Sequence, residues 1–425
     1  MNIRRGLSRI GLVAMAALAA LAGQTHAGQA LAGEPPILVA SADTTRFLPS
    51  PDALIAKTLQ DIRTNRLDDA LKEVNRVISL RPDFTLAHLI KGALLMAHAR
   101  PLSGFGPTAS AAATSAASAQ SLSDLRDEAR VRLLRHIDQP DPNYLPRQIL
   151  QLAPGQKYAL LADASRARLY LFENVNGEPR LKADYYMTIG KNGTDKRTEG
   201  DKRTPMGIYQ IAPELPRKSL TDLYGAGAFP LDYPNEWDRL QGRDGHGIWL
   251  HGVPSDTYSR PPRSSDGCVV VTNPDLKEIS RWVQAGATPV VITERADWID
   301  REAWEQTRAA LLARLQSWQA TWQEREPERF LRHYTSTFFQ SAGRGWADSK
   351  RRNISEKAWI KIGLEDLSLF LYPGTDMAYA EFTQHYSSDR LSSVSRKRLY
   401  WKMDEGQWRI VLEKTSETQT RLSQR

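Results

Sequence analysis

Two short strand-like segments, each containing a glycine turn, flank the loop that precedes the only cysteine of this 425-residue chain. The first segment is residues 247–252, which read Gly-Ile-Trp-Leu-His-Gly, and the second is residues 265–271, which read Ser-Asp-Gly-Cys-Val-Val-Val. The stretch between them is too rich in proline and polar residues for regular structure. Two adjacent strands joined by such a loop would bring the His251 imidazole beside the Cys268 thiol, which is the arrangement that a cysteine nucleophile needs.

Two alternatives stand beside this interpretation. A lone cysteine is more often a buried small apolar residue, and a lone histidine is more often a core or surface residue. A metal site made of His246, His251 and Cys268 is the second alternative, although no CxxC or HExxH pattern supports it. Gly267 favours catalysis, because glycine permits close ligand approach and because the Gly267 and Cys268 N–H groups would form an oxyanion hole.

The two segments together resemble the active-site motif of the L,D-transpeptidase (YkuD-type) catalytic domain, in which a histidine is followed by Ser/Thr-His-Gly-Cys. Residues 189–193 and 204–209 resemble the substrate-side segment of that family, and the likeness covers residues 147–295. The chain departs from the family at two positions. Asp266 stands where most members carry a second histidine, and Val270 replaces an arginine that commonly follows the cysteine.

The resemblance implies roles for residues of both segments. Cys268 is the expected nucleophile, His251 is the expected base, and the Gly252 carbonyl is expected to orient the imidazole. The N–H groups of Gly267 and Cys268 are the expected oxyanion donors. Substrate contacts are expected from Thr204, Pro205, Arg263, Ser265 and Asp266. No metal ion and no cofactor is expected.

Peptidoglycan stem peptides are the substrate that the resemblance implies. Cys268 would attack the carbonyl of the diamino acid that precedes a terminal D-alanine, leaving a thioester acyl-enzyme. An amine acceptor would make the protein an L,D-transpeptidase, and water would make it an L,D-carboxypeptidase, in cell-wall remodelling and cell shape. The alternative is a non-catalytic cell-wall-binding adaptor, but an adaptor would have no reason to keep both His251 and Cys268.

The first part of the chain has helical periodicity. Residues 28–50 are expected to be a flexible lead, and residues 51–146 a helical region. Its alanine- and serine-rich stretch at 101–120 is expected to be a linker, followed by a helix from Ser123 to Ile137. Part of the region resembles a single tetratricopeptide-type hairpin, and a plain helical bundle is an equal alternative.

The rest of the chain shows two changes of pattern. Strand signals dominate residues 147–295, where Asn176-Gly177 marks a hairpin turn and a helix is expected from Asn273 to about Ala285. Residues 296–340 read as helix, broken near Glu326-Pro327. Strands are then expected at 358–362, 367–372, 378–386, 398–403 and 408–414.

Helices followed by an antiparallel meander indicate an α+β domain at residues 296–425. Its aromatic pattern resembles the start of the cone-shaped NTF2-like fold. The expected fold class is therefore multidomain α+β, with a helical N-terminal region, a mostly-β YkuD-type catalytic domain and an NTF2-like domain. This three-part order resembles the cell-shape L,D-carboxypeptidases of helical bacteria.

The charge and the first residues indicate partners and location. A net charge of +8 and a pI near 9.4 suit an anionic polymer such as a cell wall, and no zinc-finger, RRM or basic-helix pattern favours nucleic acid. The basic loop at 190–203 is either a solvated loop or a rim for substrate carboxylates. Residues 1–27 have the charged, apolar and small-residue parts of a signal peptide, and no later stretch would span a bilayer. The mature protein is expected to be periplasmic and soluble, with a homodimer through the helical region as an open option.

Overall fold

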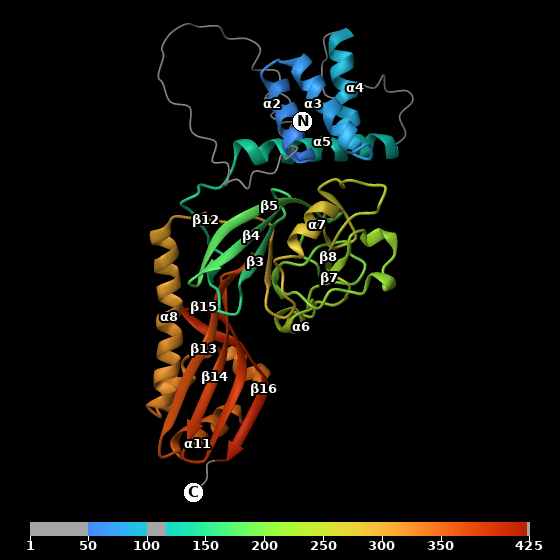
Figure 1. Cartoon of the computed structure of the whole chain (residues 1–425). Coiled ribbons are helices and arrows are strands. Elements are labelled where there is room, and N and C mark those ends of the chain that lie inside the picture. Colours follow the sequence, from blue (N-terminus) through green and yellow to red (C-terminus); the bar gives the residue numbers. More distant parts are fainter. Residues whose placement is uncertain (1–49, 100–115, 423–425) are drawn as a thin grey trace, which may run out of the picture. The chain divides into compact units, whose positions relative to one another are not determined.

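The computed structural model describes residues 50–99 and 116–422, which fall into two compact units, Met1–Ile137 and Asp138–Arg425 (Figure 1). The predicted signal peptide, the flexible lead and most of the predicted linker lie outside the described residues. Among the residues that are described, no helix is long and apolar enough to cross a membrane.

The first unit consists of helices. They are α2 (Pro51–Arg63), α3 (Leu67–Leu80), α4 (Thr85–Ala99) and α5 (Ala116–Ile137). The Ser50 side chain caps α2 by accepting from the Ala53 N–H, and Pro51 occupies the first turn, where its missing N–H costs nothing. Helices α3 and α4 form the predicted hairpin, and this hairpin packs against α2 and α5 of the same unit. A role of the unit in dimerisation stays a prediction.

Helix α5 begins earlier than the sequence indicates. It starts at Ala116, inside the stretch predicted as a linker, and not at Ser123. Alanine has the highest intrinsic helix propensity, so an alanine- and serine-rich stretch can extend a helix that is already stabilised by packing further along. Arg132 of α5 contributes to that packing, because it pairs with Asp52 of α2; it also pairs with Glu128 of its own helix at 2.9 Å.

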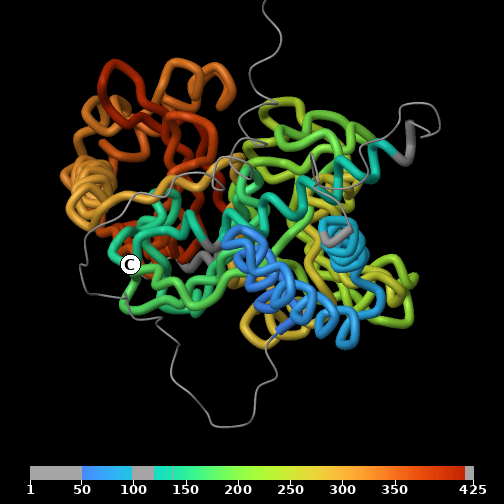
Figure 2. The backbone as a smooth tube through the Cα atoms, turned by 90° about the horizontal axis from the view of Figure 1, so that it is seen from above, coloured from blue at the N-terminus to red at the C-terminus, as the bar shows by residue number. Residues whose placement is uncertain are grey.

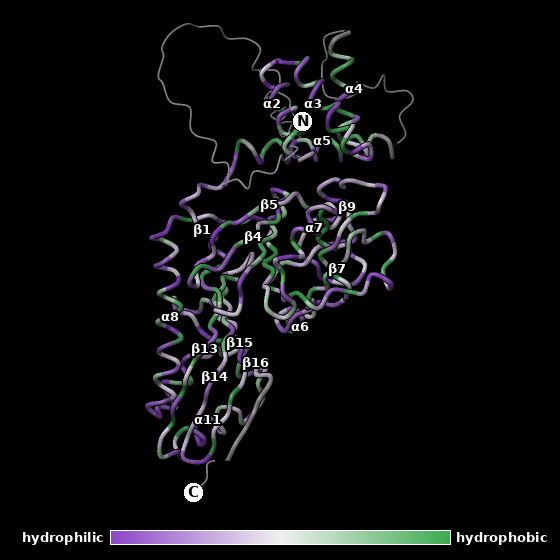
Figure 3. Tube along the Cα trace, in the orientation of Figure 1, coloured by the Kyte–Doolittle hydropathy of each residue, from purple (hydrophilic) through white to green (hydrophobic). Residues whose placement is uncertain are grey.

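A curled mixed sheet forms the first half of the second unit. Its strands are β3 (Tyr158–Asp163), β4 (Arg168–Val175), β5 (Glu178–Gly190), β6 (Gly207–Gln210), β7 (Ala228–Pro230), β8 (Trp249–His251), β9 (Arg263–Ser265), β10 (Val269–Val271) and β11 (Pro289–Thr293). The order across the sheet is β6-β11-β3-β4-β5-β10-β8-β7, with β9 beside β5. Apolar residues follow these strands (Figure 3), as expected for a sheet with both faces covered. The predicted Asn176-Gly177 turn joins β4 to β5.

Long connections and short helices lie between the later strands. The helices are η1 (Arg217–Ser219), η2 (Asp222–Tyr224), α6 (Glu236–Leu240) and α7 (Asn273–Ile279). Helix α7 ends at Ile279 and does not continue to Ala285 as predicted. The chain continues in turns, and Trp282 there packs at 5.2 Å from the Tyr158 ring, so the tertiary contact replaces further helical turns.

The second half of this unit has a helix plus an antiparallel sheet. The helices are α8 (Arg301–Gln323), α9 (Pro327–Leu331), α10 (Ser336–Ala342) and α11 (Trp346–Ser355), and the strands are β13 (Ile360–Tyr372), β14 (Met377–Ser388), β15 (Leu391–Asp404) and β16 (Gln407–Leu422). The predicted helix break is confirmed, because α9 begins at Pro327. The two strands predicted at 358–362 and 367–372 are one strand with a register shift between Glu365 and Ser368. Figure 2 shows α8 end-on beside the strands.

The two halves of the second unit share strands and a core. Strand β2 (Ile149–Gln151) pairs with β13, and β1 (Leu145–Pro146) pairs with β12 (Trp298–Ile299). Side chains of β13 alternate between two cores: Leu369 and Leu371 face the helices, whereas Phe370 and Tyr372 join a cluster that includes residues of β3, β4 and β11. The C-terminal sheet is therefore packed on the curled sheet through a common hydrophobic core.

Candidate active site

The strand pairing brings His251 and Cys268 to one place. Strands β8 and β10 are parallel neighbours, with Leu250 opposite Val269 and His251 opposite Val270. Strand β8 ends at His251 and β10 begins directly after Cys268, so the parallel pairing brings the ends of the two segments close together. The two segments singled out in the sequence thus form adjacent strands, as predicted.

The environment of His251 defines its tautomer. The side chain is only 3% exposed, and its Nδ1 lies 2.6 Å from the carbonyl oxygen of Gly252. A carbonyl only accepts, so Nδ1 carries the proton and donates, and Nε2 holds the lone pair that a general base needs. Burial lowers the pKa of His251 to about 4, with the Gly252 hydrogen bond opposing the shift and the nearby Arg260 charge adding to it. The imidazole is therefore neutral at pH 7.

Asn273 fixes the backbone that carries the Gly252 carbonyl. Its Oδ1 accepts from the N–H groups of Ala226 and Val253 at 2.7 and 3.2 Å, and its Nδ2 donates to the Val253 carbonyl at 2.8 Å. A Cβ atom at position 252 would lie 2.2 Å from Asn273 Oδ1. Glycine is therefore required there by close approach, and the orientation of the imidazole depends on this amide.

Cys268 is a partly buried thiol. Its Sγ lies 3.3 Å from the Gly247 carbonyl oxygen, to which the thiol donates. Burial raises the pKa of Cys268, and the carboxylate of Asp266 adds to the increase; a hydrogen bond from the Trp249 backbone and the charges of Arg260 and Lys196 oppose it. The thiol is therefore protonated at neutral pH, beside a neutral histidine.

Ser265 and Gly267 shape the loop that holds the nucleophile. Ser265 Oγ donates to the Cys268 carbonyl at 2.7 Å and accepts from the Gly267 N–H at 3.1 Å. Gly267 has φ of 132°, and a Cβ there would lie 2.8 Å from the Arg203 carbonyl oxygen. Because the Gly267 N–H is already engaged, it would serve as an oxyanion donor only by sharing or breaking that bond. The Cys268 N–H remains the better candidate of the predicted pair.

Thr204 and Pro205, predicted to contact substrate, are buried beneath the loop. Thr204 is 0% exposed, and its Oγ1 donates to the Gly267 carbonyl and accepts from the Gly190 N–H, both at 2.9 Å. These bonds tie the end of β5 to the nucleophile loop. The structure thus gives Thr204 a supporting position, and a direct substrate contact stays a prediction.

The two charged residues of the predicted set are exposed. Asp266 adjoins the nucleophile, and its carboxylate lies 3.4 Å from Lys191 Nζ. Arg263, on β9, lies 3.8 Å from Glu294. The Asp266 carboxylate therefore lies close enough to Cys268 to act on its thiol, whereas Arg263 pairs with a carboxylate elsewhere.

Two residues at the pair were missing from the predicted site. The Tyr224 ring packs edge-on against His251 at 5.1 Å, and the Cys268 charge contributes to the raised pKa of Tyr224. Arg260 is partly buried, and its charge acts on both His251 and Cys268. Tyr224 ends the short helix η2 and Arg260 lies in the loop between β8 and β9. Neither segment has a periodic sequence signal; an aromatic-rich stretch and an arginine-rich loop were the only indications.

The basic loop at 190–203 is organised around a carboxylate. Asp201 accepts from the Arg197, Thr198 and Arg203 N–H groups and from Lys196 Nζ, at 2.8–3.1 Å. These bonds lower the pKa of Asp201 to about 2, although burial opposes the shift. The loop is therefore a folded segment near Cys268, and the positive charge of its Lys196 acts on the Cys268 thiol.

The metal alternative has no ligand cluster to support it. Within residues 50–99 and 116–422, no three His, Cys, Asp or Glu side chains are grouped as a metal site. His246 points to a different partner, because its Nδ1 lies 3.6 Å from Glu199.

Comparison with known proteins agrees with this geometry. Residues 157–292 match the L,D-transpeptidase catalytic domain family (YkuD), and residues 310–414 match the Cds6 C-terminal NTF2-like domain. The protein therefore carries a YkuD-type L,D-transpeptidase domain followed by a Cds6-type NTF2-like domain.

Two solved structures are similar to this chain over about two thirds of its length. Bd1075 from Bdellovibrio bacteriovorus is 27% identical with a TM-score of 0.58, and the match covers 64% of this chain and 98% of that chain. The helical cell shape determining protein Pgp2 from Campylobacter jejuni is 25% identical with a TM-score of 0.55, covering 64% of this chain and 95% of that one. No curated protein sequence matches the chain.

Proposed function

We propose that the protein is an exported cysteine enzyme that acts on peptidoglycan stem peptides and forms an acyl-enzyme at the bond between the diamino acid and the terminal D-alanine. The observation that supports this proposal is the parallel pairing of β8, which ends at His251, with β10, which begins directly after Cys268. The match to the L,D-transpeptidase catalytic domain supports the choice of substrate.

The acylation step follows from the protonation states of the pair. His251 Nε2 accepts the thiol proton as Sγ attacks the carbonyl carbon, so a neutral pair becomes an imidazolium beside a tetrahedral oxyanion. The Cys268 N–H stabilises that oxyanion, an effect on the order of 10²–10³ in rate for one donor. The C–N bond then breaks, the imidazolium returns the proton to the departing amine, D-alanine leaves, and a thioester remains on Cys268.

Arg260 supports recognition of the substrate. Its guanidinium is partly buried beside the pair and forms no ion pair among the residues of the described ranges. A guanidinium binds a carboxylate through two parallel hydrogen bonds. We therefore assign Arg260 to binding the carboxylate of the terminal D-alanine. The substrate contact predicted for Asp266 is a separate one.

Water is the acceptor that we favour, which makes the protein an L,D-carboxypeptidase in cell-shape control. The domain order resembles that of the cell-shape carboxypeptidases, and Pgp2, a similar structure, is described as helical cell shape determining. The substrate lies in the cell wall, so the site of action is outside the cytoplasm; a periplasmic location after removal of residues 1–27 belongs to the same proposal.

Product analysis tests the reaction. Purified protein is incubated with tetrapeptide muropeptides, and the products are separated by chromatography and mass spectrometry. Released D-alanine with tripeptide monomers supports the carboxypeptidase, cross-linked dimers indicate a transpeptidase, and unchanged substrate contradicts both. Cys268→Ser is expected to fold and to lose turnover by on the order of 10³-fold or more, because it removes the attacking thiolate.

Labelling of the thiol separates the enzyme from the adaptor. A carbapenem acylates a nucleophilic cysteine, so a mass adduct is expected on Cys268 in the intact protein and none on the Cys268→Ser variant. If neither protein acquires an adduct and neither changes muropeptides, the cell-wall-binding adaptor becomes the better description.

A further inference from the structure

Helix α6 belongs to the YkuD-type domain, but side chains of the C-terminal sheet hold its first turn. Glu236 pairs with Arg398 of β15 at 2.5 Å and accepts from the Tyr400 hydroxyl at 3.2 Å. The Trp237 ring stacks on the Tyr400 ring, with 6.2 Å between their centroids. A helix of five residues has few hydrogen bonds of its own, so its position depends on such contacts.

Arg398 is also fixed within the C-terminal sheet. Its Nε donates to Glu381 at 3.1 Å, and the Glu381 side chain is buried. The planar guanidinium presents its donors in a rigid fork, so one carboxylate holds it while the other is bound. Arg398 therefore ties Glu236 of α6 to a buried point of the sheet.

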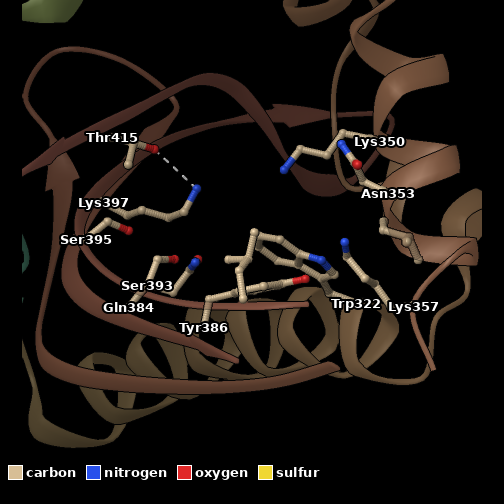
Figure 4. Close-up of a pocket in the computed structure, with 12 residues that line it drawn as sticks. Trp322, Lys350, Asn353, Lys357, Gln384, Tyr386, Ser393, Ser395, Lys397 and Thr415 are labelled. Carbon is tan, nitrogen blue, oxygen red and sulfur yellow. Dashed lines mark hydrogen bonds between the residues drawn. The ribbon is translucent and has the colours of Figure 1, made fainter. Parts of the chain in front are cut away.

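The contact with α6 lies on the opposite face of the C-terminal sheet from a pocket of the NTF2-like domain. Ser395 and Lys397 of β15 line that pocket, which has a volume of about 300 Å³ and lies beside helices α8 and α11 (Figure 4). Successive side chains of a strand point to opposite faces, so Arg398 and Tyr400 face the curled sheet. The contact between Arg398 and Glu236 is therefore not part of the pocket.

The chain leaves α6 in a fixed direction. Gly242 has φ of 69°, and its N–H donates to the Arg239 carbonyl at 3.1 Å, while the Arg243 N–H donates to the Asp238 carbonyl at 2.9 Å. Two such bonds around a glycine form a Schellman-type C-cap, which sets the path of the residues that follow a helix. A shift of α6 would therefore move the segment after it.

The residues after this cap are bound to the basic loop. Arg243 Nη2 lies 3.0 Å from Asp195 Oδ1. The Asp244 carboxylate accepts from the Glu199 N–H at 2.7 Å, and the Asp244 N–H donates to the Arg197 carbonyl at 3.1 Å. The position of α6 thus affects the loop that borders the nucleophile.

Gly247 brings the same segment to the nucleophile itself. It follows Asp244 by three residues, and its carbonyl oxygen accepts from the Cys268 thiol at 3.3 Å. Only a protonated thiol can donate, so this carbonyl favours the protonated form and fixes the direction of the S–H bond. A continuous series of contacts therefore joins the C-terminal sheet to Cys268.

We propose that the C-terminal sheet positions the nucleophile through α6, with Arg398 as a positioning residue for Cys268. Arg398 acts through Glu236, and the segment from α6 to Gly247 connects Glu236 to the thiol. The inference rests on the proposed function in one respect, that Cys268 is the nucleophile. It adds a role for the C-terminal domain in the reaction at that cysteine.

Iodoacetamide labelling of Cys268 in the full chain tests the proposal without any substrate. Glu236→Ala removes the carboxylate that Arg398 and Tyr400 hold, and leaves Arg398 paired within its own sheet. The thiol is expected to react at least about threefold faster at pH 7, because it loses the acceptor that favours its protonated form. Arg239→Ala, at an exposed position of the same helix, is expected to react at the wild-type rate. A wild-type rate in Glu236→Ala would overturn the proposal.

A second variant approaches the contact from the C-terminal sheet. Arg398→Met is expected to produce the same increase, and the double variant with Glu236→Ala no further increase, because both changes break one contact. Increases that add would overturn the proposal, since the two residues would then act separately. If Arg398→Met does not fold, Tyr400→Phe removes only the hydroxyl that donates to Glu236 and tests the same side.

Stability is controlled separately. Phe382→Ala opens a cavity in the core on the helix face of the same sheet and does not touch α6. It is expected to be labelled at the wild-type rate under conditions where circular dichroism shows folded protein. Labelling of Phe382→Ala as fast as that of Glu236→Ala would overturn the proposal, because lost stability alone would then explain the effect.

Turnover distinguishes this inference from the proposed function. Glu236→Ala is expected to lower kcat for D-alanine release by about tenfold or more, because small displacements of a reacting group are costly. If the wild-type protein releases no D-alanine, the proposed function fails, while labelling still decides whether the sheet positions the thiol. If the wild-type protein releases D-alanine and neither variant changes labelling, only the positioning role of Arg398 fails.

Discussion

At the catalytic pair, burial acts in opposite directions on the two groups and keeps both of them uncharged. It lowers the pKa of His251 to about 4 and raises that of the Cys268 thiol. A thiolate–imidazolium pair is therefore not stored in the resting protein. In the proposed reaction the proton moves from sulfur to nitrogen during the attack, when the forming oxyanion and the imidazolium are stabilised together.

The pH dependence of activity should reflect the lowered pKa of the histidine. The base must be neutral, so kcat/KM is expected to decline on the acid side with an inflection near pH 4 and to stay constant from there towards neutral pH. The measurement is kcat/KM for D-alanine release between pH 3.5 and 8, restricted to conditions where circular dichroism shows folded protein. An inflection near 6.5, the ordinary value for histidine, would contradict the effect of burial.

Two neighbouring charges should shift the thiol pKa in opposite directions. The Asp266 carboxylate raises the pKa of Cys268 and the Arg260 guanidinium lowers it. Asp266→Asn is therefore expected to lower the thiol pKa and Arg260→Gln to raise it, as measured by the pH dependence of iodoacetamide labelling. Asp256→Asn and Arg263→Gln, at exposed positions between β8 and β10, serve as controls and should leave the thiol pKa unchanged. Shifts in the same direction for Asp266→Asn and Arg260→Gln would contradict the electrostatic account.

At the level of elements, local sequence patterns predicted individual strands and turns better than they predicted which segments contact one another. The Asn176-Gly177 hairpin and the helix break at Pro327 follow from residues adjacent in sequence, and both are present. The hydrogen bonds of the Asn273 side chain and the contacts of Tyr224 and Arg260 join segments that are far apart in the sequence, so no local pattern indicates them. The candidate histidine and cysteine could be proposed from the sequence because each lies in a short contiguous motif.

The turn after β8 offers a test of the hydrogen bonds that the Asn273 side chain makes to the backbone. Gly252→Ala would place a Cβ 2.2 Å from Asn273 Oδ1 and 3.0 Å from the Ala226 nitrogen. The expected result is a loss of about 1–3 kcal/mol in the free energy of unfolding, together with a larger loss of activity, because the Gly252 carbonyl would no longer orient His251. Urea denaturation and D-alanine release measure the two effects. Gly155→Ala is the control, since a Cβ there meets nothing within 4 Å.

Over the whole molecule, the catalytic and NTF2-like parts behave as one body, Asp138–Arg425. Phe370, Tyr379 and Tyr400 of the C-terminal sheet lie in the same hydrophobic cluster as Phe172 and Val291 of the curled sheet. Polar contacts also cross this junction: Asn235 Nδ2 donates to the Tyr372 hydroxyl at 3.1 Å, and Arg398 pairs with Glu236 at 2.5 Å. The sequence predicted two adjoining domains, because a hydrophobic core shared by segments so far apart in the chain leaves no local sequence pattern.

Cooperative unfolding should follow from that shared core. A fragment of residues 138–425 is expected to unfold in one urea transition, with tryptophan fluorescence and far-UV circular dichroism coinciding. Phe370→Ala, which opens a cavity towards the curled sheet, and Phe382→Ala, which opens one towards the helices, should each cost about 3–5 kcal/mol and shift that same transition. Two separated transitions, or a variant that affects only one of them, would show that the parts unfold independently.

Strand β2 has a consequence for how the protein is made. Gln151 donates to the Leu367 carbonyl, 216 positions further along the chain. When the ribosome has released the half of this unit that contains the curled sheet, it has not yet released β13, the strand with which β2 pairs. The apolar side chains of β2 therefore lack their final neighbours until the rest of the chain has been made. Such long-range closure slows folding and exposes the waiting strand to wrong partners.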